Sequence, residues 1–141
     1  MNFELLPHQG LPELPFGIPP AAALTLLGTP DLVEEESEQE AGFHLFVQVF
    51  EGPGLSLFYN SGPEPLLRAI ESVNKSLLLW DTKVFDLNEQ ALYELLKSRG
   101  ELSLEREKEA WGESRITSPE FGIDFYFENG KMSAIYWEAA S

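Results

Sequence analysis

Cysteine is absent from this chain of 141 residues, and its absence removes several kinds of chemistry at once. The protein cannot form disulfides, use a thiolate nucleophile or build a zinc site from cysteine ligands. Histidine is nearly as scarce, with only His8 and His44. Neither one sits in a catalytic-serine pattern or at metal-ligand spacing from a partner. We therefore expect no enzyme activity, no metal and no cofactor.

Long apolar segments are missing too. No window approaches the roughly 18 apolar residues of a membrane-spanning helix. The N-terminal stretch has no basic segment and is interrupted by Pro7, Pro12 and Pro15, which is atypical of a secretory signal. Phosphate-binding glycine loops are not evident, because Gly10 and Gly17 neither follow a strand nor open a helix. We expect a cytoplasmic protein that folds around a hydrophobic core.

Basic residues are few. The chain has 24 acidic residues against 9 Lys and Arg, a net charge of −15. Residues 1–67 contain ten carboxylates and no Lys or Arg at all. Such a surface repels nucleic-acid phosphates and anionic membranes, and attracts a basic protein. We predict a basic protein partner, no nucleic acid and no membrane. The alternative is that the acidity serves solubility alone.

Two short helices are predicted, one in Pro19–Gly28 and one over Glu89–Ser98. Proline at the first turn and glycine after the last mark the first helix. Leu92, Leu95 and Leu96 give the second an apolar face. Strands are predicted around the following segments: Phe43–Phe50, Leu55–Tyr59, Leu66–Val73, Leu102–Leu104, Ile116, Ile123–Glu128 and Lys131–Trp137. Asn129-Gly130 predicts the turn of the last hairpin.

Two stretches 68 residues apart are nearly the same, GLSLFYNSG from Gly54 and GIDFYFENG from Gly122. Ala69-Ile70 and Ala134-Ile135 follow them. We predict a single α+β domain (1–141) built by tandem α-β-β-β duplication. Its pseudo-repeats span about 18–73 and 87–138 and are joined by a connector, 74–86. Antiparallel strands would form one or two sheets, with both helices packed on one face.

The sheet face opposite the helices is the candidate binding surface. If Val47 and Val49 face the core, alternation turns the neighbouring aromatic residues outward. The predicted outer set is Phe46, Phe50, Phe58, Tyr126 and Tyr136. Aromatic clusters rimmed by charge are typical of protein interfaces. Alternatively, the N-terminal proline segment, the connector or a second copy covers this face, which leaves a homodimer open.

The acidic run that begins at Glu34, Glu35 and Glu36 has two interpretations. It is either a docking surface for a basic partner or a solvated acidic hairpin or mobile loop. It has no calcium-loop spacing. A separate alternative is a carboxylate cleft for a small ligand or for hydrolysis, using Asp81, Asp124 or His44.

The phrase LLGTP, Leu26 to Pro30, follows the first predicted helix. It resembles the signature that opens the helix-and-meander units of the beta-lactamase inhibitory protein and of small outer-membrane lipoproteins of the barrel-assembly machinery. The resemblance covers residues 18–62, and the second half has Glu101-Leu102 where the first has Thr29-Pro30. In size and charge the chain is also similar to small acidic bacterial immunity proteins. These likenesses imply a non-enzymatic inhibitor of a basic toxin, and a homo-oligomeric structural protein is the alternative.

Overall fold

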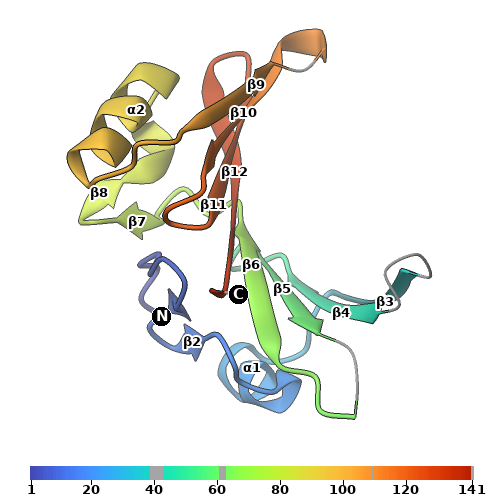
Figure 1. Ribbon diagram of the computed structural model, residues 1–141. Helices are drawn as coiled ribbons and strands as arrows, with labels where there is room; N and C mark the ends of the chain where they lie inside the picture. The colour runs from blue at the N-terminus through green and yellow to red at the C-terminus, as the bar shows by residue number, and fades with distance from the viewer. Residues whose placement is uncertain (39–42, 61–62, 109, 141) are drawn as a thin grey trace.

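The computed structural model describes residues 1–38, 43–60, 63–108 and 110–140, with side chains except at 36–38, 43–45 and 110. Two helices, α1 (Pro20–Leu27) and α2 (Glu89–Ser98), accompany an antiparallel sheet of eight strands (Figure 1). The α+β class is therefore confirmed. The eight strands are β3 (Leu32–Glu38), β4 (Phe43–Phe50), β5 (Leu55–Asn60), β6 (Leu67–Ser72), β9 (Glu105–Lys108), β10 (Glu113–Ser118), β11 (Ile123–Glu128) and β12 (Lys131–Glu138).

The strand order is symmetrical about the middle of the sheet: β3-β4-β5-β6-β12-β11-β10-β9. Each half is a helix followed by a four-stranded meander, and the last strands of the two meanders pair at the centre. There Ile135 lies opposite Ser72, and Trp137 lies opposite Ile70. One sheet therefore runs through both halves of the chain.

The two similar stretches occupy equivalent places in this sheet. Strands β5 and β11 alternate identically between buried and half-buried positions. Each pairing has a register shift at the matching step, between Phe58 and Tyr59 in one and between Tyr126 and Phe127 in the other. The matched alanines also agree, because Ala69 lies opposite Phe58 and Ala134 lies opposite Tyr126. Common descent of the two units stays a prediction.

Gly54 and Gly122 begin the two stretches for the same backbone reason. Both have a left-handed φ, 68° and 66°, which residues other than glycine adopt only with strain. Both positions are also crowded. A Cβ on Gly54 would lie 3.2 Å from the backbone nitrogen of Asn74, and one on Gly122 would lie 2.9 Å from the ring of His8. Glycine is therefore required at the same position of both turns, immediately before β5 and before β11.

Two strand predictions need correction. The acidic segment after Asp31 is a strand, β3, so each unit has four strands rather than three. In the second half the strand begins at Glu105, after the predicted Leu102 and Leu104. Leu102 is 93% exposed, because the chain there still connects α2 to the sheet edge. Hydrophobicity alone therefore misplaced β9.

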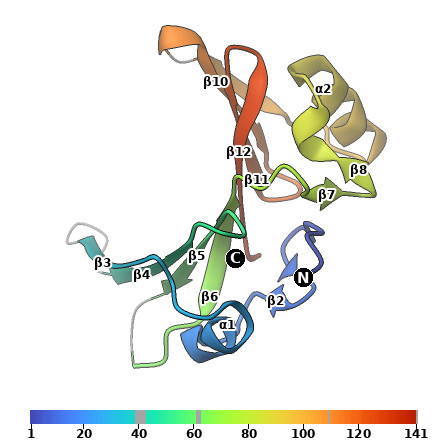
Figure 2. The same cartoon turned by 180° about the vertical axis from the view of Figure 1, so that it is seen from behind.

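The core lies between the sheet and the helices, which Figures 1 and 2 show on one side of it. Asn88 caps α2 by accepting a hydrogen bond from the backbone nitrogen of Ala91 at 2.9 Å, and Leu92 and Leu96 are buried. Neither helix described is long and apolar enough to cross a membrane. The same side also holds short elements, which are β1 (Gly10–Leu11), β2 (Leu14–Pro15), β7 (Leu78–Leu79), β8 (Thr82–Lys83) and the 3₁₀ turn η1 (Val84–Asp86).

The N-terminal segment and the connector both pack into this core. Leu5 donates its backbone N–H to the carbonyl of Leu78 at 2.8 Å, which joins the two segments. The indole N–H of buried Trp137 donates to the Gly10 carbonyl at 3.2 Å. Trp137 lies on the core face of the sheet, so these two segments cover that face and not the opposite one.

A carboxylate fastens the corresponding turn in each unit. Asp31 accepts a 2.7 Å hydrogen bond from the backbone of Glu51, between β4 and β5. Glu101 accepts from the Ser118 hydroxyl at 2.6 Å and from the backbone of Glu120 at 3.1 Å, beside the β10–β11 turn. Burial opposes ionisation of Glu101, but these hydrogen bonds outweigh it and lower the pKa of its carboxyl.

Candidate functional site

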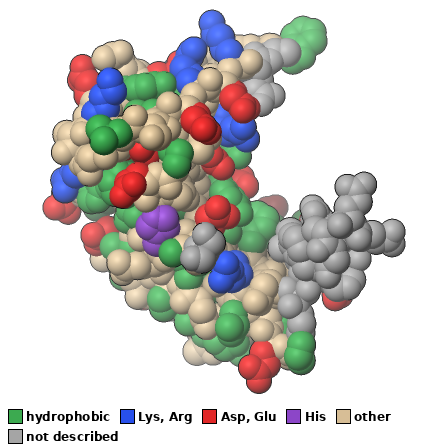
Figure 3. All heavy atoms as spheres, in the orientation of Figure 1, with side chains coloured by type: hydrophobic (Ala, Val, Ile, Leu, Met, Phe, Trp, Pro, Cys, Tyr) green, Lys and Arg blue, Asp and Glu red, His purple; other side chains and the backbone are tan. Residues whose placement is uncertain are grey.

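The face of the sheet away from the core is the candidate site, and we call it the open face. Directly paired residues share a face, so the strand registers define its members. Tyr136 lies opposite both Glu71 and Asp124, and Phe58 lies opposite Val47 and Ala69. Figure 3 shows that the outline of the molecule curves inward on this side, below the projecting β9–β10 hairpin.

Three aromatic side chains lie half-buried on the open face, as predicted: Phe58, Tyr126 and Tyr136. Phe58 and Tyr136 meet edge to face, with ring centroids 5.7 Å apart. They come from different units, so this contact crosses the symmetrical centre of the sheet. Burial and the neighbouring carboxylates of Glu138 and Asp124 raise the pKa of Tyr136 to about 12. Its hydroxyl therefore stays protonated at neutral pH and can donate a hydrogen bond.

The predicted outward placement of Phe46 and Phe50 is wrong. Phe50 is 2% exposed and lies opposite Leu55, and Phe46 packs on Tyr59 with centroids 5.5 Å apart. Gln48 shares their face and is buried, because the Tyr59 hydroxyl donates to its side-chain oxygen at 2.7 Å. The prediction assumed that Val47 and Val49 face the core, but Val47 lies opposite Phe58, and the hydrogen bond to Tyr59 satisfies Gln48 within the core instead.

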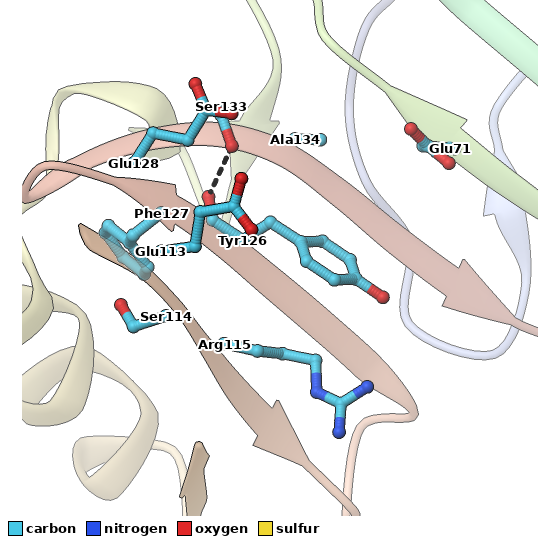
Figure 4. A pocket seen from close by; sticks show the side chains of 9 residues that line it. All are labelled: Glu71, Glu113, Ser114, Arg115, Tyr126, Phe127, Glu128, Ser133 and Ala134. Carbon is cyan, nitrogen blue, oxygen red and sulfur yellow. Dashed lines mark hydrogen bonds between the residues drawn. The ribbon is translucent and has the colours of Figure 1, made fainter. Parts of the chain in front are cut away.

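A cavity of about 390 Å³ opens on this face over β6, β12, β11 and β10 (Figure 4), and we call it the central hollow. Its lining residues are Glu71, Glu113, Ser114, Arg115, Tyr126, Phe127, Glu128, Ser133 and Ala134. A second cavity of about 230 Å³ lies toward β5 and the turn before it, and Glu71 lines this one as well. Glu71 is therefore the residue shared by the two hollows.

Glu71 is a half-buried carboxylate that forms no ion pair with any residue whose side chain the structure describes. Burial raises the pKa of its carboxyl, since ionisation is less favourable away from water. Among the described residues the two ion pairs lie elsewhere, Arg106 with Glu89 and Arg115 with Glu107. A Lys or Arg side chain of a partner could therefore form an ion pair with Glu71, which has none with the described side chains.

Negative charge dominates the open face. Its carboxylates, by strand register, are Glu34, Glu71, Glu105, Glu107, Glu113, Asp124, Glu128 and Glu138. The basic residues at the same paired positions are Arg115 and Lys131. Glu34 thus belongs to the open face, whereas Glu35 lies opposite Phe46 and shares the other face. Glu36 lies in β3, and its side chain falls outside the described ones.

The residues of the alternative carboxylate cleft are not brought together at the central hollow. Asp81 is exposed in the β7–β8 turn, with a left-handed φ of 62°. Asp124 lies on the open face and accepts a 2.6 Å hydrogen bond from Thr117. The side chain of His44 lies outside the described residues. Within the described part of the chain, no three His, Asp or Glu residues are grouped as a metal site would require.

Comparison with known proteins found no relative of this chain. No family model matches the chain, and no match is found among curated proteins or among solved structures. The candidate site therefore depends on geometry. Sequence reasoning missed its centre, Glu71, because only the pairing of β6 with β12 places that residue between the two units.

Proposed function

We propose that this chain is a non-enzymatic protein-binding module whose open face binds a basic protein. The observation that carries the proposal is the acidic and aromatic face centred on Glu71, over which no other described segment packs. Both chain segments that could have covered it, the N-terminal segment and the connector, pack on the opposite side. Uncovered faces with aromatic residues among charged ones favour macromolecular partners.

The charge distribution favours a basic partner over a second copy. Two open faces brought together would oppose carboxylate to carboxylate, and like charges at an interface are unfavourable. A basic surface would instead be attracted from a distance, since the whole chain carries −15. The half-buried Glu71 would then face a Lys or Arg of the partner. Phe58, Tyr126 and Tyr136 would supply apolar contact area around that pair.

An immunity-type role agrees best with these properties. In such a role a small acidic protein of the bacterial cytoplasm binds a basic toxin, such as a nuclease, and blocks its active surface. A wide, hollowed sheet can cover a convex basic surface of that kind. This assignment also fits the helix-and-meander resemblance of LLGTP, which implied an inhibitor.

The test is capture of a partner on immobilised protein at about 50 mM and about 500 mM salt, since screening weakens charge attraction. Native protein is compared with Glu71→Gln and with Glu94→Gln. The second variant removes a charge of the same sign from Glu94, which is exposed on α2, away from the open face. We expect a basic protein that is retained at low salt by native protein and Glu94→Gln, and retained poorly by Glu71→Gln.

Two results would contradict the proposal. One is a captured protein that both variants lose equally, which would show general charge attraction rather than a site. The other is a dimer whose mass by light scattering is the same at both salt concentrations and is unaffected by added basic protein. That dimer would support the homo-oligomeric alternative.

A further inference from the structure

Trp111 is the most exposed tryptophan of the chain. Its side chain is 94% exposed, whereas Trp137 is fully buried and Trp80 packs edge to face on Phe121. Trp111 belongs to the 3₁₀ turn η2 (Ala110–Gly112) at the tip of the β9–β10 hairpin. A tryptophan can bury about 150–250 Å² of surface, and within this fold nearly all of that area stays in water. The described contacts within the chain therefore give no packing reason for it.

The backbone at Trp111 is unfavourable as well. Its φ of 66° lies in the left-handed region, which a bulky side chain rarely adopts. Glycine or asparagine would be accommodated there with less strain. The residue thus combines local strain with exposure. Strain of this kind concentrates at binding sites, where the surrounding structure holds it in place.

The surrounding structure does hold the tip. The backbone nitrogen of Asn129, in the β11–β12 turn, donates to the Gly112 carbonyl at 2.9 Å. Gly112 itself has a left-handed φ of 78°, and a Cβ there would meet the side-chain oxygen of Asn129, so glycine suits this turn. The two neighbouring hairpin tips are thereby joined, and Figure 1 shows them together at one end of the sheet. A side chain presented from a fixed turn loses less entropy on binding.

The tip stands at the rim of the central hollow. Glu113, two residues after Trp111, lines that hollow and lies opposite Glu128, which lines it too. Both carboxylates are exposed. A partner seated on the open face would therefore meet an aromatic ring and two negative charges at this end.

We propose that Trp111 is an anchor residue that inserts into an apolar recess on the same basic protein that binds the open face. The inference rests on the proposed function. The recess it fits is rimmed by Lys or Arg, which Glu113 and Glu128 would contact. Tryptophan is among the residues that contribute most to binding free energy in protein interfaces.

A displayed library of random peptides serves as the probe, because it presents apolar and basic residues in all combinations. Peptides are selected on native protein, and their affinities are measured for native protein, Trp111→Ala and Leu102→Ala. Leu102 is the matched control, since it is 93% exposed but precedes β9 at the far end of that strand. Thermal unfolding of each variant checks that it folds.

We expect selected peptides that combine basic with apolar residues. They should bind Trp111→Ala at least about 30-fold more weakly than native protein, as for an interface anchor, and Leu102→Ala normally. Binding should also shift the tryptophan fluorescence of native protein to the blue and leave that of Trp111→Ala unshifted, since Trp111 is the exposed indole among the three.

The outcomes separate this inference from the proposed function. Basic peptides that bind native protein and Trp111→Ala equally would overturn the anchor and leave the proposed function standing. Trp111-dependent peptides without basic residues would overturn both the basic recess and the proposed function. A native dimer that Trp111→Ala converts to a monomer would show that a second copy occupies the site, and would overturn the inference. A selection in which no peptide binds native protein more tightly than Trp111→Ala would overturn it as well.

Discussion

Glu101→Gln tests whether the buried carboxylate stabilises the second unit. Glutamine keeps the shape of the side chain, but its amide nitrogen would face the backbone N–H of Ser103, which one oxygen of Glu101 now accepts at 3.0 Å. Hydrogen bonds to charged groups contribute about 1.5–3 kcal/mol, and the Glu101 carboxylate accepts from Ser103, Ser118 and Glu120. We therefore expect the free energy of unfolding to fall by about 2–4 kcal/mol. In a chain of this size the midpoint would drop by roughly 6–15 °C.

Thermal unfolding followed by circular dichroism measures this change. Because the pKa of Glu101 is lowered in the folded state, its stabilisation exists above the unfolded pKa of about 4.3 and disappears as pH falls through the lowered value. The gap between native and variant should therefore narrow in acid. Asp31→Asn is the comparator, since exposed Asp31 accepts one such bond and should lose less than about 1 kcal/mol. Equal losses for the two variants would refute the reasoning.

Three further predictions concern the core, a turn and the open face. Tyr59→Phe leaves buried Gln48 without its donor and should cost about 1–3 kcal/mol in chemical denaturation, and an unchanged midpoint would contradict this. Gly54→Ala forces a left-handed φ on alanine and should cost about 1–2 kcal/mol, measured the same way, whereas Gly52→Ala, with open space around it, should cost less. Glu71→Gln should raise the melting temperature near pH 7, because the raised pKa of Glu71 means that stability is lost as the carboxyl ionises, and the gain should vanish near pH 4. A variant less stable than native at both pH values would exclude that effect.

Alternation predicted the faces of some strands correctly and failed for one, for a physical reason. In β5 and β11 the apolar positions alternate with positions that tolerate water, so Leu57 and Phe125 face inward as expected. In β4 large apolar residues occur at both parities, so the pattern does not choose a face. The pairing with β5 determines which side of β4 faces the core, and the hydrogen bond from Tyr59 satisfies Gln48 on that side.

The candidate site was less predictable than the fold. The aromatic residues Phe58, Tyr126 and Tyr136 were found from strand alternation alone. In the sequence nothing distinguishes Glu71 from the other glutamates, and it becomes the centre of the face only when β6 pairs with β12. Trp111 lies in a charged segment without periodicity, and its exposure follows from its place at a hairpin tip. Local sequence patterns do not reveal which distant segments come into contact.

Carboxylate footprinting tests the central claim most directly. The protein is labelled with a carbodiimide and an amine, alone and with its captured basic partner, and each modified carboxylate is identified by mass spectrometry. The account predicts that the partner protects Glu71, Glu113 and Glu128 on the open face and leaves Glu94 on α2 equally reactive. Protection of Glu94 with no protection of the three open-face carboxylates would place the binding surface on the helices and contradict the account.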